Sequence, residues 1–358
     1  MEGKLLMTPG PTRVPDRVLR KMSEAVLHHR TIEYSKVFGE LSERLKYVFQ
    51  TDKTVLTFPA VGTGGLESAI VNMFSEGDRV LVVCTGVFGE RFATIARNYR
   101  LKVDTIDVEW GKSVSLDQIE EKFDDNIYKG LIVTHNETST AVLNPIEKIG
   151  EYMKDKNALF IVDSVSGLGG LDIKMDEWNI DVLITACQKA LMSPPGLAFV
   201  GVSDKAWERA QESKIPKYYW DYINCRKYLE KVNPQNPYTP AVSLVSATNE
   251  ALKMIQEEGL QNVFKRHEIL ATRLRKATND MGLKIFTDSN SLSNNLTAFT
   301  FEEQGKAIEI KKRMEEEYNI VISGGQAHLN GKMIRIGHMG FVDQEMIDLT
   351  VNALKNCL

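Results

Sequence analysis

The chain has 358 residues, of which 43% are hydrophobic and 26% charged, with a formal net charge of −4. This composition is typical of a soluble globular protein, and the length predicts two domains rather than one core. The negative charge argues against a nucleic-acid-binding function, and no apolar run is long enough to span a membrane. We expect a cytoplasmic protein without a metal site, because there is no signal peptide and the four cysteines are scattered without Cys-x-x-Cys pairs.

Residues 1–15 contain Pro9, Gly10, Pro11 and Pro15, which disfavour a helix and predict an extended N-terminal arm. Such an arm is expected to lie across a partner subunit or a cleft, unless it is simply a frayed terminus. Two helices should follow, the first beginning near Pro15 and the second covering about residues 33–49.

From residue 53 onward, short β-rich runs alternate with helical stretches. Strands are expected at 55–58, 79–83, 102–106, 131–133, 159–162, 182–184 and 198–202. Helices are expected between the first strands, at 64–74, 90–99, 116–123 and 145–154. Continuous Val, Ile and Leu strands separated by helices predict an α/β fold with a mostly parallel seven-stranded sheet covered on both faces.

Beyond this sheet the chain is mainly helical as far as a long helix at about 241–258. After Gly259, short strands alternate with helices, which is typical of a smaller α+β domain. We therefore expect an N-terminal arm (1–15), a large domain (16–258) and a small C-terminal domain (259–358).

Two charged residues lie where buried strands should end. Asp163 follows the strand 159–162, and Lys189 lies beyond the strand 182–184 and before Pro194. A buried charge is costly unless it is paired or reactive, and a lysine with a lowered pKa can form a Schiff base with a carbonyl. Taken alone, a lysine there would more often extend its charge to solvent.

Two further segments lie at strand ends. Gly62-Thr63-Gly64-Gly65 joins a strand to a helix, and free backbone N–H groups at such a junction bind anions. These glycines would equally allow a helix to pack close to a strand. Phe88 lies between two glycines, and its ring would stack on a planar ligand or pack in the core.

An anion site, an aromatic ring, a carboxylate and a lysine together match the needs of pyridoxal 5′-phosphate. The helix N-terminus would take the phosphate, the carboxylate would keep the ring nitrogen protonated, and the lysine would form the Schiff base. Because ligands bind at the carboxyl ends of parallel strands, we expect the four groups to meet there.

The sequence resembles the class V aminotransferases, and within them the alanine–glyoxylate and serine–pyruvate aminotransferase group. The resemblance covers essentially the whole chain, and its most specific segments contain Asp163 and Lys189. Its motifs are residues 8–12 (TPGPT), 29–31 (HRT), 62–64 (GTG), 86–91 (GVFGER), 135–140 (HNETST), 162–170 (VDSVSGLGG), 188–191 (QKAL), 238–240 (YTP) and 334–337 (IRIG).

The resemblance implies a fold-type I enzyme that is a homodimer with both active sites at the subunit interface. It implies that Lys189 binds the cofactor covalently and that Asp163 pairs with its ring nitrogen. It implies the following further contacts: phosphate at Thr63, Gly64 and Gln188, the cofactor at Gly65, the cofactor ring at Phe88, its phenolic oxygen at Thr138, the neighbouring subunit's phosphate at Thr239, and the substrate carboxylate at Arg335.

Three residues depart from the pattern of the group. Phe88 replaces a tryptophan usual in animal members, Gly65 replaces a histidine found in many, and Asn236 replaces a tyrosine found in some. These departures concern cofactor affinity and fine specificity rather than the reaction.

The implied reaction is a ping-pong transamination from a small amino acid, alanine or serine, to glyoxylate or pyruvate. Aspartate or 2-aminoethylphosphonate would be the donor if Arg13 or Arg30 supplied a second anion-binding group. A cysteine desulfurase would need a reactive cysteine near the small domain, and Cys357 is poorly placed for that role. A cofactor-binding subunit without turnover is the remaining alternative.

Overall fold

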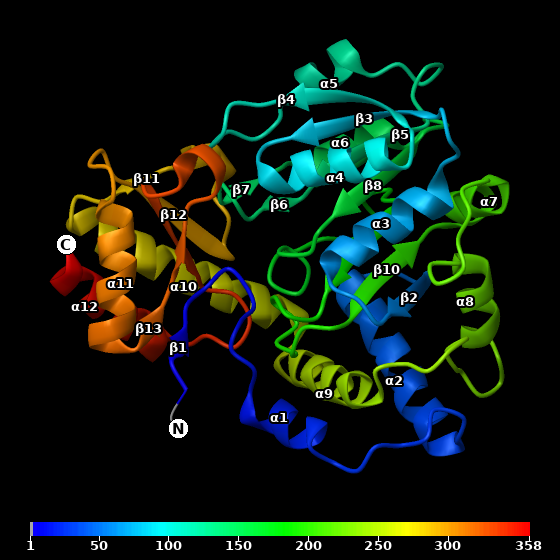
Figure 1. Cartoon of the computed structure of the whole chain (residues 1–358), viewed down its shortest axis with the longest axis horizontal. Helices are drawn as coiled ribbons and strands as arrows, with labels where there is room; N and C mark the ends of the chain where they lie inside the picture. Colours follow the sequence, from blue (N-terminus) through cyan, green and yellow to red (C-terminus); the bar gives the residue numbers. More distant parts are fainter. Residues whose placement is uncertain (1–2) are drawn as a thin grey trace.

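The computed structural model describes residues 3–358 and contains the predicted seven-stranded sheet (Figure 1). The strand order is β2-β10-β9-β8-β5-β3-β4. These strands are β2 (Thr54–Phe58), β3 (Arg79–Cys84), β4 (Lys102–Asp107), β5 (Gly130–Thr134), β8 (Leu159–Asp163), β9 (Val182–Ala186) and β10 (Ala198–Val202). Only β10 is antiparallel to its neighbours β9 and β2, so the other six strands end at the same edge of the sheet. The predicted α/β fold is confirmed.

Helices cover both faces of this sheet, and alternate strand residues face each layer. In β5, for example, Leu131 and Val133 belong to one hydrophobic cluster and Ile132 to the other. The first layer contains α2 (Ile32–Phe49), α5 (Leu116–Lys122), α6 (Ile146–Met153) and α9 (Val242–Glu258). The second contains α3 (Gly62–Met73), α4 (Val87–Asn98), α7 (Asp204–Glu212) and α8 (Tyr222–Leu229). Burial on both faces explains why the strands are continuous runs of Val, Ile and Leu.

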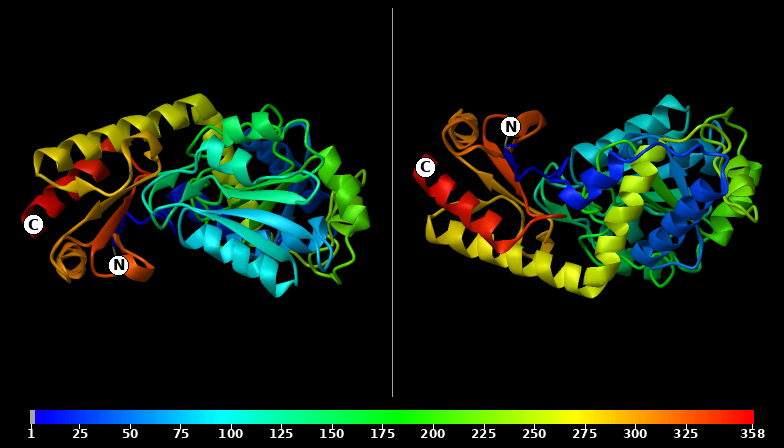
Figure 2. Two further views of the ribbon diagram at one scale, coloured as in Figure 1. Left: turned by 90° about the horizontal axis from the view of Figure 1, so that it is seen from above. Right: turned by 90° about the horizontal axis from the view of Figure 1, so that it is seen from below.

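The C-terminal part forms a separate four-stranded antiparallel sheet of order β11-β12-β15-β14. Its strands are β11 (Lys284–Ile285), β12 (Leu296–Thr300), β14 (Ser323–Gly324) and β15 (Met333–Gly337). Helices α10 (Leu260–Asp280), α11 (Lys306–Tyr318) and α12 (Gln344–Cys357) pack with it, and two short 3-10 turns lie at Ser289–Ser291 and Ala327–Leu329. Figure 2 shows this sheet beside the large one, with α10 continuing from the end of α9.

From residue 3 onward, the N-terminal arm packs against other parts of its own chain. Strand β1 (Leu5–Leu6) pairs in parallel with β13 (Ile320–Val321) of the small sheet region, and Met7 is buried in the hydrophobic core there. The arm then returns to the large domain and enters the short helix α1 (Asp16–Met22). The arm thus bridges the two sheets. The boundaries 1–15, 16–258 and 259–358 stay a prediction.

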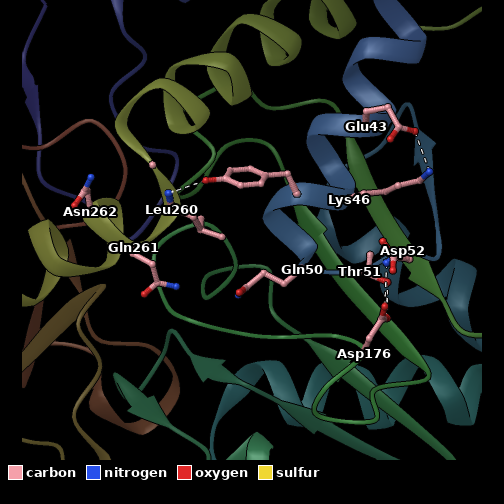
Figure 3. Close-up of a pocket in the computed structure, with 11 residues that line it drawn as sticks. Glu43, Lys46, Gln50, Thr51, Asp52, Asp176, Leu260, Gln261 and Asn262 are labelled. Carbon is pink, nitrogen blue, oxygen red and sulfur yellow. Dashed lines mark hydrogen bonds and ion pairs between the residues drawn. The ribbon is translucent and has the colours of Figure 1, made fainter.

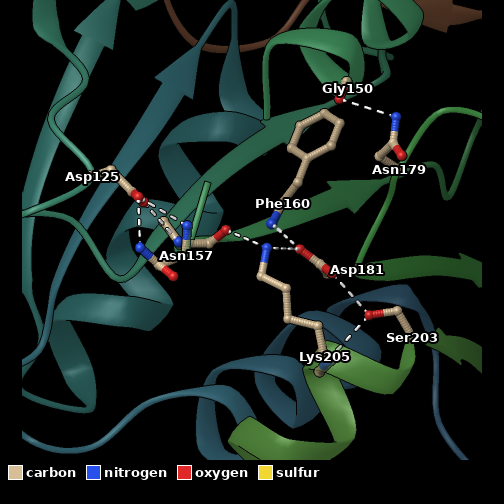
Figure 4. A network of polar contacts seen from close by, with 10 residues as sticks. Asp125, Gly150, Asn157, Phe160, Asn179, Asp181, Ser203 and Lys205 are labelled. Carbon is tan, nitrogen blue, oxygen red and sulfur yellow. Dashed lines mark hydrogen bonds and ion pairs between the residues drawn. The ribbon is translucent and has the colours of Figure 1, made fainter. Parts of the chain in front are cut away.

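A polar network fixes the opposite edge of the large sheet (Figure 4). Asp181, just before β9, accepts hydrogen bonds from the Phe160 N–H at 2.8 Å, the Lys205 ammonium at 2.9 Å and the Ser203 hydroxyl at 2.8 Å. These bonds tie α7 to the sheet at the edge away from the predicted site. The network therefore serves the fold, because every donor around the carboxylate is already used within the chain.

The structure differs from the sequence-based expectations in two local details. The helix expected at 90–99 begins three residues earlier, at Val87. A small hairpin, β6 (Asn136–Glu137) and β7 (Val142–Leu143), follows β5 and was not expected, because strands of two residues carry no periodic signal.

Candidate active site

The predicted site residues gather at the edge where the six aligned strands end. Asp163 is the last residue of β8, and Lys189 comes three residues after the end of β9, its parallel neighbour. Phe88 follows β3, and Thr63 follows β2 through the start of α3. The expectation that these groups share one sheet edge is met by the strand order.

The N-terminal arm covers Lys189. Its ammonium donates a hydrogen bond to the Pro9 carbonyl at 2.7 Å, while the Thr12 hydroxyl donates to the Lys189 carbonyl at 2.8 Å. Gly10 has a φ of +125°, and a Cβ there would lie 2.4 Å from the lysine Cδ. Only glycine fits this position, because a side chain would collide with the lysine and the backbone conformation disfavours one.

Burial makes the Lys189 amine unusually easy to deprotonate. Loss of solvent, with a smaller contribution from the nearby Arg335, lowers its pKa to about 8, while Asp163 opposes the shift. A deprotonated amine is the form that attacks a carbonyl and accepts a proton. The structure therefore gives this lysine the properties of a nucleophile and a base near neutral pH.

Labelling of Lys189 by pyridoxal phosphate and borohydride should therefore depend on pH with a midpoint near its lowered pKa of about 8. The unprotonated fraction rises from about a tenth at pH 7 to about nine tenths at pH 9, whereas unperturbed lysines titrate near about 10.4. Peptide mass spectrometry of cofactor-free protein measures the initial rate at each site. A Lys189 profile parallel to that of exposed lysines would contradict the assignment.

Asp163 is a buried carboxylate with room for a cationic partner. One of its oxygens accepts a hydrogen bond from the Val165 N–H at 2.9 Å, and among residues 3–358 no other donor bonds to the carboxylate. Burial raises its pKa to about 7, so near neutral pH the carboxyl group holds a proton for much of the time. A protonated ring nitrogen beside it would supply the missing donor and positive charge.

Arg335 reaches this edge from the small sheet. It lies on β15 and is only 6% exposed, with Nε donating to the Gly324 carbonyl at 2.9 Å and Nη1 to the Thr138 carbonyl at 2.8 Å. No carboxylate pairs with it among residues 3–358, and burial lowers its pKa to about 10, so it stays charged. An unpaired buried guanidinium with free N–H groups on Nη2 is suited to a carboxylate ligand.

The parts of the chain that form the large and the small sheet meet at the segment that carries Thr138 and at the loop that follows Asp163. The Thr138 hydroxyl donates to the Ser166 hydroxyl at 2.7 Å, which in turn donates to the Asn136 carbonyl at 2.8 Å. Asn295 of the small domain donates to the Ser166 carbonyl at 2.7 Å. Because these groups are bonded to one another, the loops are held in place before any ligand binds.

Glu137 is a functional residue that the sequence reasoning did not single out. Its buried carboxylate accepts from the N–H groups of Phe88 at 3.0 Å, Gly89 at 3.2 Å and Ser139 at 3.0 Å, and also from the Ser139 hydroxyl. The Ser139 hydroxyl in turn accepts from the Val87 N–H at 3.0 Å. These contacts cap the first turn of α4, which explains why this helix begins at Val87 rather than near residue 90.

Glu137→Gln should lower the free energy of unfolding by about 2–3 kcal/mol, because the amide nitrogen turns one acceptor into a donor facing other donors. The midpoint of urea denaturation of the cofactor-free protein measures the loss. Glu121→Gln, on the exposed side of α5, is the matched control and should change the midpoint little. Equal midpoints for the two variants would show that the carboxylate contributes nothing to the cap.

The start of α3 contains the candidate anion site. The Gly64 and Gly65 N–H groups already donate to the Val61 carbonyl, at 2.8 and 3.3 Å, which leaves the N–H groups of Gly62 and Thr63 unused within residues 3–358. A Cβ on Gly65 would lie 2.8 Å from Ile184 of β9. Gly65 thus allows the helix to pack close to the sheet, which is the second role that the sequence left open for these glycines. Its N–H group is already bonded to the Val61 carbonyl.

The other predicted cofactor contacts fall into two groups. Phe88 is half-buried in the first turn of α4, and Gln188 is half-buried beside Lys189, so both lie at the site. Thr239 is exposed on the loop before α9 and makes no hydrogen bond to these residues within the chain. Asn236, one of the departures, is buried and accepts a hydrogen bond from Tyr34 at 2.6 Å, so it has a packing role here.

The residues present fit pyridoxal phosphate. The observation that carries this conclusion is a part-buried lysine, a buried carboxylate with one donor and a buried arginine with no carboxylate among residues 3–358, all at one sheet edge. A metal site is not assembled, since no group of three or more His, Cys, Asp or Glu side chains in residues 3–358 is placed to hold an ion. Within the same residues, no helix is both long and apolar enough to cross a membrane.

The surface groove of about 760 Å³ shown in Figure 3 lies elsewhere. It is bordered by the end of α2 and the start of α10, where the Tyr47 hydroxyl accepts from the Leu260 N–H at 2.9 Å. None of the predicted site residues lines it. Two pairs of its polar side chains, Glu43 with Lys46 and Thr51 with Asp176, are bonded to each other, and its size alone indicates no function.

The arrangement of the sheet, the lysine and the aspartate defines a fold-type I, pyridoxal phosphate-dependent enzyme. The sequence model of the family described as aminotransferase class V matches residues 5–348, and the chain belongs to this family. The protein is therefore an aminotransferase.

Named relatives cover nearly the whole chain. An uncharacterized aminotransferase of Methanocaldococcus jannaschii is 42% identical, covering 99% of this chain and 92% of the relative. A protein of Synechococcus named as the small subunit of a soluble hydrogenase is 39% identical, with the same two coverages. A serine–glyoxylate aminotransferase of Methylorubrum extorquens is 36% identical, covering 95% of this chain and 87% of that protein.

Among solved structures, an alanine–glyoxylate aminotransferase from Nostoc superposes with a TM-score of 0.95. It is 30% identical in sequence, and the match covers 100% of this chain and 96% of that one. The resemblance to the alanine–glyoxylate and serine–pyruvate group is thereby confirmed.

Proposed function

We propose that the protein transfers an amino group from a small monocarboxylic amino acid, alanine or serine, to glyoxylate or pyruvate. The observation that carries this proposal is the buried guanidinium of Arg335, which lies near Lys189 and has no carboxylate partner among residues 3–358. The names of similar aminotransferases support the same substrates.

Lys189 would move the proton. Its amine is buried, uncharged for much of the time near pH 8, and held by a single hydrogen bond to Pro9. The amine would therefore be able to hold the cofactor and to accept and return the α-proton of the amino acid. When bound, pyridoxal phosphate supplies an electron-withdrawing ring that makes this proton removable. Asp163 would keep the ring nitrogen charged.

The neighbouring side chains would position the ligands. Arg335 would grip the substrate carboxylate, and Thr138, whose hydroxyl proton is used by Ser166, would offer its oxygen lone pair. Phe88 would stack on the ring. Thr63, Gly64 and Gln188 would surround the phosphate, with the free N–H groups at the start of α3 as donors.

The positions of other arginines favour a monocarboxylic substrate. Arg30 is engaged by the Asn236 carbonyl at 2.7 Å, and Arg13 lies over the Phe341 ring at 5.4 Å. Neither is free to bind a second carboxylate in this arrangement. Aspartate and 2-aminoethylphosphonate are therefore the less favoured donors. A desulfurase role is not favoured either, because all four cysteines are buried and Cys357 lies in the core around α12.

Arg335→Lys should raise the KM for the amino acid about 10- to 100-fold with a smaller change in kcat, because an ammonium cannot form the paired bonds of a guanidinium. Steady-state kinetics with alanine or serine measures both constants. Arg275→Lys is the matched control, since this buried arginine of the small domain bonds Ser293 away from the site. An unchanged KM would remove Arg335 from substrate binding.

The substrate assignment is tested by mixing the cofactor-loaded protein with single amino acids and recording the cofactor absorbance. Alanine or serine should change the spectrum within seconds, and glyoxylate or pyruvate should reverse the change. A response to aspartate or 2-aminoethylphosphonate alone would replace the proposed donor. A bound cofactor that responds to no amino acid would support the alternative of a cofactor-binding subunit without turnover. One relative is named as a subunit of a soluble hydrogenase, which agrees best with that alternative.

We also propose a homodimer in which Thr239 reaches the partner's phosphate. Large hydrophobic side chains are exposed near this loop, with Val232 at 99% and Ile32 at 72%. The Arg30 bond to Asn236 holds their two segments side by side. A second copy would cover this surface. Sedimentation should give a dimer, which Ile32→Asp weakens and Ile308→Asp, exposed on α11, does not. A wild-type monomer would refute the proposal.

A cytoplasmic location is proposed as well, because all four cysteines are unpaired and therefore suit a reducing compartment. Cell fractionation with an antibody tests it, and recovery outside the cytoplasm would refute it.

A further inference from the structure

Arg91 is a charged residue at the site with no assigned role. It lies one turn after Phe88 on α4, and its Nη1 donates to the Thr63 hydroxyl at 3.3 Å. Its guanidinium lies over the Phe88 ring, 4.7 Å from the centroid. No carboxylate pairs with it among residues 3–358, although most surface arginines of the chain form such pairs.

The proposed phosphate ligands have no positive charge. Thr63, Gly64, Gln188 and Thr239 are neutral, and the N-terminus of α3 contributes only a partial charge. A phosphate ester carries up to two negative charges, and a site shielded from water normally compensates them with a guanidinium or an ammonium. One cation is therefore missing from the set.

Lys189 and Arg335 are not available for this task. The proposed function already assigns the lysine amine to the covalent attachment of the cofactor, and the arginine is fixed by its bonds to the Thr138 and Gly324 carbonyls. Arg91 instead contacts the first turn of α3, where two backbone N–H groups are unused. The positive charge of Arg91 lowers the pKa of both Asp163 and Lys189. Arg91 therefore lies close enough to both residues to belong to the same site.

We infer that Arg91 is the cationic ligand of the cofactor's phosphate, acting with Thr63 at the start of α3. The inference rests on the proposed cofactor-binding function. Under this inference, Arg335 binds the substrate carboxylate and Arg91 neutralises the cofactor's phosphate. Arg91 is then not available for a second carboxylate of the substrate. The ring of Phe88 has two faces, so one can hold Arg91 while the other stays free for a planar ligand.

Binding of pyridoxamine 5′-phosphate and of pyridoxamine to the cofactor-free protein tests the inference without turnover. The two probes share the ring and differ only in the phosphate, and the fluorescence of either probe reports binding. We expect Arg91→Gln to weaken the phosphorylated probe about 10- to 100-fold and pyridoxamine less than about twofold. Arg91→Lys should fall between, because it keeps the charge and loses the planar fork.

Arg97→Gln, exposed on the same helix, is the matched control and should leave both affinities unchanged. Equal losses for the two probes in Arg91→Gln would overturn the inference, because Arg91 would then act only through the Phe88 ring. No loss for either probe would overturn it as well. Failure of the wild-type protein to bind the phosphorylated probe would instead refute the proposed cofactor-binding function.

Discussion

Lys189→Ala is expected to lower kcat by at least about 10³- to 10⁴-fold, the range spanned by a well-placed acid–base group. No nearby side chain can replace Lys189 as the group that transfers the proton. Arg335 stays protonated, and Asp163 is assigned to the ring nitrogen of the cofactor. Single-turnover kinetics with alanine, started from cofactor-loaded protein, measures the effect on proton transfer. An active Lys189→Ala enzyme would refute the mechanism.

The lower kcat of Lys189→Ala could come from lost proton transfer or from a displaced N-terminal arm, and a rescue experiment separates the two. Removal of the lysine also removes its bond to Pro9 and leaves space beside Gly10. If proton transfer is the lost function, added methylamine should restore part of the rate and the gain should follow the free-base concentration. A displaced arm would give no such rescue and would expose the arm to proteolysis.

Asp163→Asn is the second large effect, and it is expected to change activity and stability in opposite directions. The amide cannot hold a proton on the cofactor ring by charge, so kcat should fall about 10²- to 10³-fold, as for other preorganised electrostatic groups. Steady-state kinetics at saturating cofactor measures this loss. A kcat within threefold of wild type would show that the carboxylate is not needed.

The stability of the cofactor-free protein should rise in the same variant. Burial raises the Asp163 pKa to about 7, above its ordinary value, so the folded state binds a proton that the unfolded state has released between about pH 4 and 7. The wild type therefore loses stability as pH rises through this window, and the asparagine variant does not. At pH 8 the variant should be more stable by about 2–4 kcal/mol. A urea titration at pH 5 and pH 8 measures the difference, which should be clearly smaller at pH 5, where only about one pH unit of this window has been crossed.

The sheet and the lysine–aspartate pair were predictable because both have strong local signals. Runs such as 159–162 and 182–184 are uninterrupted β-branched and aliphatic segments, and the charged residue after each is conspicuous. The α4 boundary was not predictable, because its cap comes from Glu137 and Ser139, some 50 residues further along the chain. Sequence patterns near the helix contain no sign of such a partner.

The roles of individual glycines and arginines could not be predicted from the sequence, because they depend on neighbours in space. The glycines at 62–65 looked alike in the sequence, yet Gly65 faces the sheet while the free N–H groups belong to its predecessors. Arg91 looked like any helix-surface arginine, and only its distance from Thr63 and Phe88 separates it from Arg97. A searchable signal did exist, since a site for a phosphate ester with only neutral ligands is short of one cation.

The pairing of β1 with β13 has a consequence for the order in which the pocket forms during synthesis. Leu5 leaves the ribosome at the beginning, but its partner Ile320 is made near the end, so the arm has nowhere to dock until most of the chain exists. The Pro9 contact with Lys189 and the fit of Gly10 against it depend on that docking. The lysine is consequently enclosed last, after both sheets have been made. An affinity tag on the N-terminus would act directly on this closing step, whereas one after Leu358 would not.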